Sequence, residues 1–215
     1  MKQSLFPAIR IYLFFTILLG LAYPYLMTGI SQVVFAKQAS GEFLSRGGQL
    51  IGAKLIGQKF EKPEYFWPRP SAVDYNPLPS GGTNLGPTSA DLKKAVDERR
   101  VKMKAANPDS VGEPPQDLLF ASASGLDPQI SVVAAEYQAP RIAKARKLPQ
   151  EKVGDIIKQN TESRQLGILG EVFVNVLTLN LALDHAQGID TAPVLLPVAT
   201  PSATATPGPT ESHTS

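Results

Sequence analysis

A glycine-rich stretch at residues 80–92, SGGTNLGPTSADL, is the first candidate for chemistry. Its adjacent glycines and hydroxyl side chains precede a helical pattern, and the backbone N–H groups of such a turn can bind a phosphate. The common phosphate loop reads Gly-x-x-x-x-Gly-Lys-Ser/Thr, but here Gly86 is followed by Pro87, which has no N–H to donate. The stretch therefore favours a turn leading into a helix cap over a phosphate site.

A second group of residues could support hydrolysis. Ser122 or Ser124 would be the nucleophile, Asp127 the carboxylate and His185 the base, because the other histidine, His213, lies in a low-complexity tail. No nucleophile elbow or metal-ligand spacing accompanies these residues. An anchored enzyme outside the cytoplasm, or a solute-binding or sensor module, stays open as an alternative function.

Composition excludes several other kinds of site. The chain of 215 residues has no cysteine and two histidines, which excludes thiol catalysis, disulfides and zinc sites built on cysteine or on several histidines. No carboxylate cluster suits a cation cage, so we expect no metal site in this chain. The formal net charge of +2 is too small to indicate nucleic-acid binding.

The N-terminal region predicts a membrane anchor. Residues 11–36 contain no charged side chain, and about 20 apolar residues suffice to cross a bilayer. A signal peptide has a shorter apolar region of about 7–15 residues, so an uncleaved anchor is favoured. Pro24 should kink this helix because it removes a backbone donor. Gly20 and Gly29 either permit close approach of a partner helix or face lipid.

The anchor is expected to leave its N-terminus in the cytoplasm and the soluble domain outside. Two basic residues, Lys2 and Arg10, precede the span, while Lys37 and Arg46 lie after it. A short leader with no folded domain upstream favours export of the soluble domain. The predicted fold is α+β, with one transmembrane helix, a single mixed soluble domain and a disordered tail rich in Pro, Thr and Ser. The boundaries are a leader at 1–10, the transmembrane helix at 11–36, the soluble domain at 37–186 and the tail at 187–215.

Within the soluble domain the pattern predicts short elements around one long loop. Residues 61–82, which we call the proline-rich loop, hold five prolines and the clustered aromatics Tyr65, Phe66 and Trp67, so the loop should be ordered. Before the loop, the pattern predicts short strands with a bend at 49–60. After it, a helix capped by Thr88 or Ser89 should carry Leu92, Val96 and Met103 as its apolar stripe, and a short strand should follow near 117. The remaining expected elements are a helix capped by Ser131 and bent at Pro140, a short helix containing Asp155–Ile157, and a strand at 172–176 followed by a helix.

Seven segments in a fixed order resemble one known family. They are LIGQKF, YFWPRPSAVDYNP, SGGTNLGPTSADL, ANPD, ASASGLDPQIS, AAEYQAPRIAKAR and VNVLTLNLALD, all behind one N-terminal anchor. Together they resemble the KdpC family, the C subunits of the bacterial Kdp high-affinity potassium-transporting ATPase, over residues 5 to 185. The proline- and threonine-rich tail lies outside the resemblance.

The resemblance implies an accessory, non-catalytic subunit in the cell inner membrane. Its partners would be a potassium-selective channel-like subunit, a P-type ATPase subunit and a small membrane subunit, together with membrane lipid. The chain lacks the Asp-Lys-Thr-Gly phosphorylation motif, which agrees with this role. Family members are described as catalytic chaperones that raise the ATP affinity of the hydrolysing subunit.

The resemblance also makes ATP a candidate ligand and suggests residues for two kinds of contact. The glycine-rich stretch resembles the signature loop of ABC ATPases, and its nucleotide candidates are Ser80, Gly81, Gly82, Thr83 and Asn84. ATP is absent outside the cytoplasm, however, where the predicted orientation and the family resemblance place this loop. The partner-interface candidates are Gly20, Pro24 and Gly29 in the anchor and Tyr65, Phe66, Trp67 and Arg69 in the docking segment 63–79.

Arg69 has two predicted roles. It could pair with a partner carboxylate or repel an entering cation, or it could form an internal salt bridge with Asp74 or Glu64.

Overall fold

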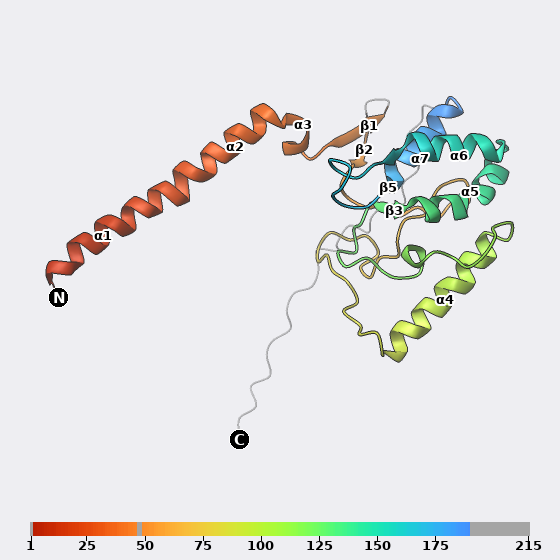
Figure 1. Ribbon diagram of the computed structural model, residues 1–215, viewed down its shortest axis with the longest axis horizontal. Coiled ribbons are helices and arrows are strands. Elements are labelled where there is room, and N and C mark those ends of the chain that lie inside the picture. The colour runs from red at the N-terminus through yellow and green to blue at the C-terminus, as the bar shows by residue number, and fades with distance from the viewer. Residues whose placement is uncertain (1, 47–48, 190–215) are drawn as a thin grey trace, which may run out of the picture. The chain divides into compact units, whose positions relative to one another are not determined.

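The computed structural model describes residues 2–46 and 49–189 (Figure 1). The chain divides into two compact units, Met1–Leu55 and Ile56–Ser215. From residue 190 onward, the predicted disordered tail lies outside the described residues.

The first unit begins with a long apolar helix. It comprises α1 (Lys2–Ile17), a π-helical turn (Leu18–Ala22) and α2 (Tyr23–Val34). Leu5–Val34 is long and apolar enough to cross a membrane. The helix starts earlier than the expected span at 11–36 because Arg10 does not interrupt it, and a long basic side chain near the end of a span can reach toward water.

The π-helical turn lies immediately before Pro24. Tyr23 N–H donates to Leu18 O, five residues earlier, and Pro24 occupies the first turn of α2. A wider turn of this kind accommodates a proline ring within a continuous helix. Gly20 lies in this turn and Gly29 in α2, and a Cβ added at either glycine would meet nothing within 4 Å. Neither glycine is therefore required by packing within the described chain.

A short helix and a hairpin complete the first unit. Helix α3 (Ala36–Ala39) precedes the antiparallel strands β1 (Phe43–Arg46) and β2 (Gln49–Ala53), whose register shifts at Leu44/Ser45. The strand expected over 49–60 thus ends at Ala53.

The second unit holds a small antiparallel sheet in the order β3 (Gln129–Ser131), β5 (Phe173–Asn175), β4 (Thr161–Glu162). Two of its strands lead directly into helices, because a side chain caps each junction. Ser131 Oγ accepts from Ala134 N (3.0 Å) at the start of α5 (Val132–Arg146). Asn175 Oδ1 accepts from Thr178 N (3.1 Å) at the start of α7 (Val176–Ala186). Helix α6 (Gln150–Gln159) packs against both α5 and α7.

The predicted α+β class is confirmed, with differences in the short elements. The Ser131 cap, the short helix near Ile156 and the strand followed by a helix at 172–186 are confirmed. The strand expected near 117 is instead a 3₁₀ helix (Gln116–Leu118), because Pro115 starts a tight turn there. Pro140 lies inside α5.

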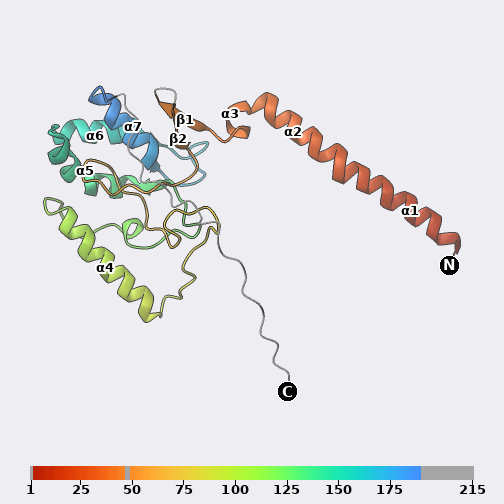
Figure 2. The same cartoon turned by 180° about the vertical axis from the view of Figure 1, so that it is seen from behind.

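Helix α4 (Ala90–Ala106) lies apart from the other helices of this unit. Ser89 caps it as predicted, with Oγ accepting from Leu92 N (3.3 Å). Val96 and Met103 are its buried residues, which matches the predicted stripe except at half-buried Leu92. Figures 1 and 2 show α4 on one side of this unit and α6 on the other, with α5 between them. The core includes Phe60, Tyr65, Phe66, Val96, Met103, Leu118, Ile130, Ile142, Ile157, Val174, Leu179 and Leu183.

Candidate functional site

Two buried carboxamides hold the backbone of the proline-rich loop. Asn180 Oδ1 accepts from Phe66 N (2.8 Å), and Asn180 Nδ2 donates to Phe66 O (3.0 Å). Gln138 makes the same pair of hydrogen bonds to the next residue: its Oε1 accepts from Trp67 N (2.8 Å), and its Nε2 donates to Trp67 O (3.1 Å). Both amide side chains are fully buried. Each amide supplies the hydrogen-bond partners that the backbone of a neighbouring strand would supply in a sheet.

Arg141 extends this support to the residues before Phe66. Its Nη1 donates to Tyr65 O (3.0 Å) and to Pro63 O, and its Nε donates to Asn107 Oδ1 (3.0 Å). The guanidinium lies 4.4 Å from the centre of the Trp67 ring. Burial lowers the pKa of Arg141 to about 10. The carbonyl oxygens around it compensate for part of the lost hydration.

A buried ion pair between α5 and α7 supports the same loop. Arg146 Nη2 donates to Asp184 Oδ1 (2.6 Å), and Arg146 Nε donates to Glu64 O (2.7 Å). The Tyr65 hydroxyl donates to Asp184 Oδ2 (3.2 Å). Burial, followed by the Asp184 charge, raises the pKa of Tyr65. The loop is therefore ordered, as predicted, by polar side chains from α5 and α7.

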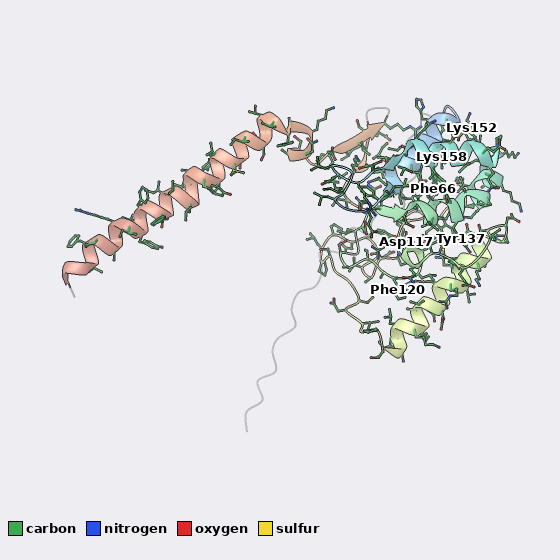
Figure 3. All side chains as sticks on the ribbon, viewed as in Figure 1. Phe66, Asp117, Phe120, Tyr137, Lys152 and Lys158 are labelled. Atoms are coloured by element: carbon green, nitrogen blue, oxygen red, sulfur yellow. The ribbon has the colours of Figure 1, made fainter. Side chains whose placement is uncertain are left out.

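These contacts define where the predicted interface aromatics lie. Phe66 and Tyr65 are in the core, at 0% and 8% exposure, and Figure 3 shows Phe66 among the helices and strands. Trp67 is half-buried. The sequence did not single out Gln138, Asn180, Arg141 or Arg146 as supports. The signal was present in α7, where Asn180 and Asp184 lie one turn apart on the same face as buried leucines.

Arg69 forms an internal salt bridge, but with a different partner from those predicted. Its Nη1 lies 2.9 Å from Asp127 Oδ2. Asp74 instead pairs with Lys59 (2.8 Å), so the predicted Asp74 and Glu64 pairings are wrong. The reason lies in the tertiary fold. A backbone hydrogen bond from Ser122 N to Pro70 O (3.0 Å) places the segment 122–127 beside the loop, and one from Gly57 N to Leu126 O (2.7 Å) joins this segment to the chain just before the loop.

The glycine-rich stretch packs against that same segment. A Cβ on Gly82 would lie 3.0 Å from Ala123 O, and one on Gly125, whose φ is +70°, would lie 2.8 Å from Gly81 O. The predicted turn and helix cap are confirmed, because Ser89 N donates to Gly86 O (3.0 Å) across Pro87 and Thr88 and the Ser89 side chain caps α4. The side chains of Ser80, Thr83 and Asn84 are exposed. Nucleotide contact by Ser80, Gly81, Gly82, Thr83 and Asn84 stays a prediction.

The residues considered for hydrolysis have other partners. Asp127 pairs with Arg69 and also accepts from Gln129 N (3.0 Å). Ser124 Oγ accepts from Leu126 N (3.1 Å), and Ser122 is buried. His185 is exposed, and the neighbouring Asp184 carboxylate is bonded to Arg146 and Tyr65. Among residues 2–46 and 49–189, no group of three or more His, Asp or Glu side chains is placed to hold a metal ion.

One groove combines Arg69 with residues of the small sheet. We call this cavity of about 540 Å³ the Arg69 groove. Its lining includes Arg69, Asp117, Asp127, Ile130, Leu169 and Val172. It brings the predicted interface residue Arg69 next to residues 163–172, which the sequence did not indicate as a site.

Comparison with known proteins gives one family. The family model described as "K+-transporting ATPase, c chain" (KdpC) matches residues 5–185. A potassium-transporting ATPase KdpC subunit of Polaromonas naphthalenivorans is 49% identical over 193 residues, covering 88% of this chain and 98% of that protein. Subunits with the same name from Herminiimonas arsenicoxydans and Burkholderia mallei are each 48% identical over 190 residues. They cover 86% and 87% of this chain, and 99% and 98% of their own lengths. The chain therefore belongs to the KdpC family.

Proposed function

We propose that this chain is the accessory, non-catalytic subunit of an ATP-driven high-affinity potassium uptake pump, and that it stabilises the assembled complex. One observation supports this most: the family match over residues 5–185 includes both the apolar span Leu5–Val34 and the folded soluble region. The tightly bonded loop supports it further, because a rigid body presents a partner surface at low entropic cost.

The partners we propose are a potassium-selective channel-like subunit, a P-type ATPase subunit and a small membrane subunit. The anchor would pack against their helices at Gly20 and Pro24, which lie about one helical turn apart, and at Gly29 on another face, about two and a half turns after Gly20. A Cβ added at either glycine would meet nothing within 4 Å, so packing inside the described chain does not require these glycines, and glycine lets a partner helix approach closely. The segment 63–79 would contribute to docking through its exposed residues and Arg69.

Affinity purification tests this proposal. The tagged chain is isolated from native membranes after growth under potassium limitation, and its companions are identified by mass spectrometry. We expect the other pump subunits to accompany it in near-equal amounts. Recovery of this chain alone, in a detergent that keeps other membrane complexes intact, would contradict the proposal.

We also propose that the soluble region lies outside the cytoplasm. The chain contains no cysteine, so a Val111→Cys variant carries a single thiol, at a position that is 97% exposed. A membrane-impermeant maleimide should label it in intact spheroplasts to the same extent as in lysed ones. Labelling that requires lysis would place the region in the cytoplasm.

A catalytic-chaperone role is a separate part of the proposal. Removing this chain should raise the ATP KM of the pump several-fold, and adding it back should restore the original value. If Ser80–Asn84 contact ATP directly, a Thr83→Ala/Asn84→Ala double variant should give the same rise. A normal KM in that variant would exclude direct contact by these side chains and leave the accessory role intact.

A further inference from the structure

A hairpin at residues 163–172 presents an apolar tip to solvent. Leu166, Ile168 and Leu169 are 89%, 76% and 54% exposed. The stretch from Gln165 to Gly170 contains no charged side chain. Apolar side chains that are gathered in this way, rather than scattered singly, mark an interaction site.

Internal hydrogen bonds fix the shape of this tip. Gln165 and Leu169 exchange backbone hydrogen bonds of 2.9 Å, and Ile168 N donates to Gln165 O (3.2 Å). Leu166 has φ +53°, a left-handed conformation that is unfavourable for leucine. Asparagine or glycine would be less strained there, and burial of Leu166 against a partner would offset the strain.

The Arg69 groove adjoins the hairpin, because Leu169 and Val172 help to line it. Within the described residues, Arg69 donates from Nη1 to Asp127, and its buried Nε has no acceptor. The buried Nε is out of a partner's reach, but 29% of the Arg69 side chain is exposed. The groove therefore offers a partly exposed arginine side chain to a partner's oxygen atom beside an apolar contact surface.

The edge of β3 along this groove is already satisfied by side chains. Gln129 N donates to Asp127 Oδ1 (3.0 Å), and Ser131 N donates to Asp117 Oδ2 (2.7 Å). These two carboxylates occupy the positions that an added strand would need. A partner must therefore bind here through side chains or loops.

We propose that the 163–172 hairpin and the Arg69 groove form the surface by which the soluble region docks onto another subunit of the pump. The hairpin tip enters an apolar socket of that subunit, and Arg69 pairs with one of its carboxylate or carbonyl oxygens. The inference rests on the proposed function, because it takes its partner from the same complex.

A protein partner fits this surface better than a lipid surface does. Protein interfaces combine an apolar centre with a polar, hydrogen-bonding rim. Here the apolar tip adjoins Arg69, Asp117, Asp127 and Glu171, all of which line the groove. Lipid tails offer no acceptor for Arg69, and the three carboxylates are unfavourable next to anionic headgroups.

Photo-crosslinking of the full chain in native membranes tests the proposal. Benzophenone maleimide is attached to a tagged Leu166→Cys chain, with Val111→Cys as the matched exposed control. Illumination should join position 166, but not position 111, to another pump subunit. An adduct of position 166 with lipid alone, or with no protein, overturns the proposal.

Recovery of the complex gives a second test. Ile168→Asp should lower recovery of the partner subunit by about tenfold, the scale of losing one well-buried interface side chain. Val111→Asp should leave recovery unchanged, and unfolding followed by Trp67 fluorescence shows that both variants are folded. If the unsubstituted chain recovers no pump subunit, the proposed function fails. If it does and Ile168→Asp recovers as much, the docking surface alone is wrong.

Discussion

At the scale of single residues, side-chain amides take the place that backbone pairing has in a sheet. Asn180 bonds both polar groups of Phe66, and Gln138 bonds both polar groups of Trp67. The periodicity of α7 could have marked Asn180 as a polar residue on a buried face, but neither bonding partner could be predicted, since the bonded residues are 114 and 71 positions apart. Local propensity and periodicity carry no information about partners at such separations.

Replacing Asn180 by alanine should destabilise the soluble region strongly. The change leaves the buried N–H and C=O of Phe66 without partners, at a cost of about 2–5 kcal/mol. Trp67 is the single tryptophan, so its fluorescence during urea unfolding reports on this region in the full chain. His185→Ala, on the exposed side of the same helix, should change the free energy of unfolding by less than about 0.5 kcal/mol. Equal stability of the two variants would contradict the role given to Asn180.

Tyr75 predicts a dependence of stability on alkaline pH. Burial, followed by the Asp74 charge, raises the pKa of Tyr75. An unfolded tyrosine ionises near pH 10, so above about pH 10 the unfolded state binds fewer protons and stability falls as pH rises. Tyr75→Phe lacks this contribution, and its free energy of unfolding should fall less steeply between about pH 9 and pH 11. Parallel curves for the two proteins would show that Tyr75 does not contribute.

At the scale of elements, features set by local chemistry were predictable, whereas strands β3 and β4 were not. The caps at Ser89 and Ser131 arise from hydroxyl residues placed before helical patterns. Strand β4 has two residues and β3 has three, too few to show a period of two. The Arg69–Asp127 salt bridge was missed because it depends on how these short elements bring 122–127 to the proline-rich loop.

Substitution of the two glycines in the membrane helix should affect assembly of the pump without affecting the stability of this chain. Gly20→Leu with Gly29→Leu should leave the isolated chain intact, because neither added side chain meets an atom within 4 Å of the Cβ position. If partner helices pack closely on these glycines, the bulkier residues should reduce co-purification of the pump subunits in mild detergent. Leu26→Ala is a control within the same helix. Unchanged co-purification of the double variant would argue that both glycines face lipid.

At the scale of the whole molecule, the division into two units predicts independent folding. Residues 56–189 contain the small sheet, its helices and the hydrogen bonds described above that hold the proline-rich loop. A chain lacking 1–55 should therefore fold, with a free energy of unfolding close to that of the full chain by Trp67 fluorescence. An unfolded product would show that the first unit is needed for the fold.

The amide supports of the proline-rich loop also have a consequence for sequence variation. A strand held by backbone pairing keeps its hydrogen bonds whatever side chains its neighbour carries. Residues Phe66 and Trp67 keep theirs only while positions 180 and 138 remain carboxamides of the right length. In a library of variants, even Asn180→Asp or Gln138→Glu should be poorly tolerated, since a carboxylate cannot donate to a carbonyl. The positions most sensitive to substitution should therefore include those on α5 and α7 whose side chains bond the loop backbone, and not only positions within the loop.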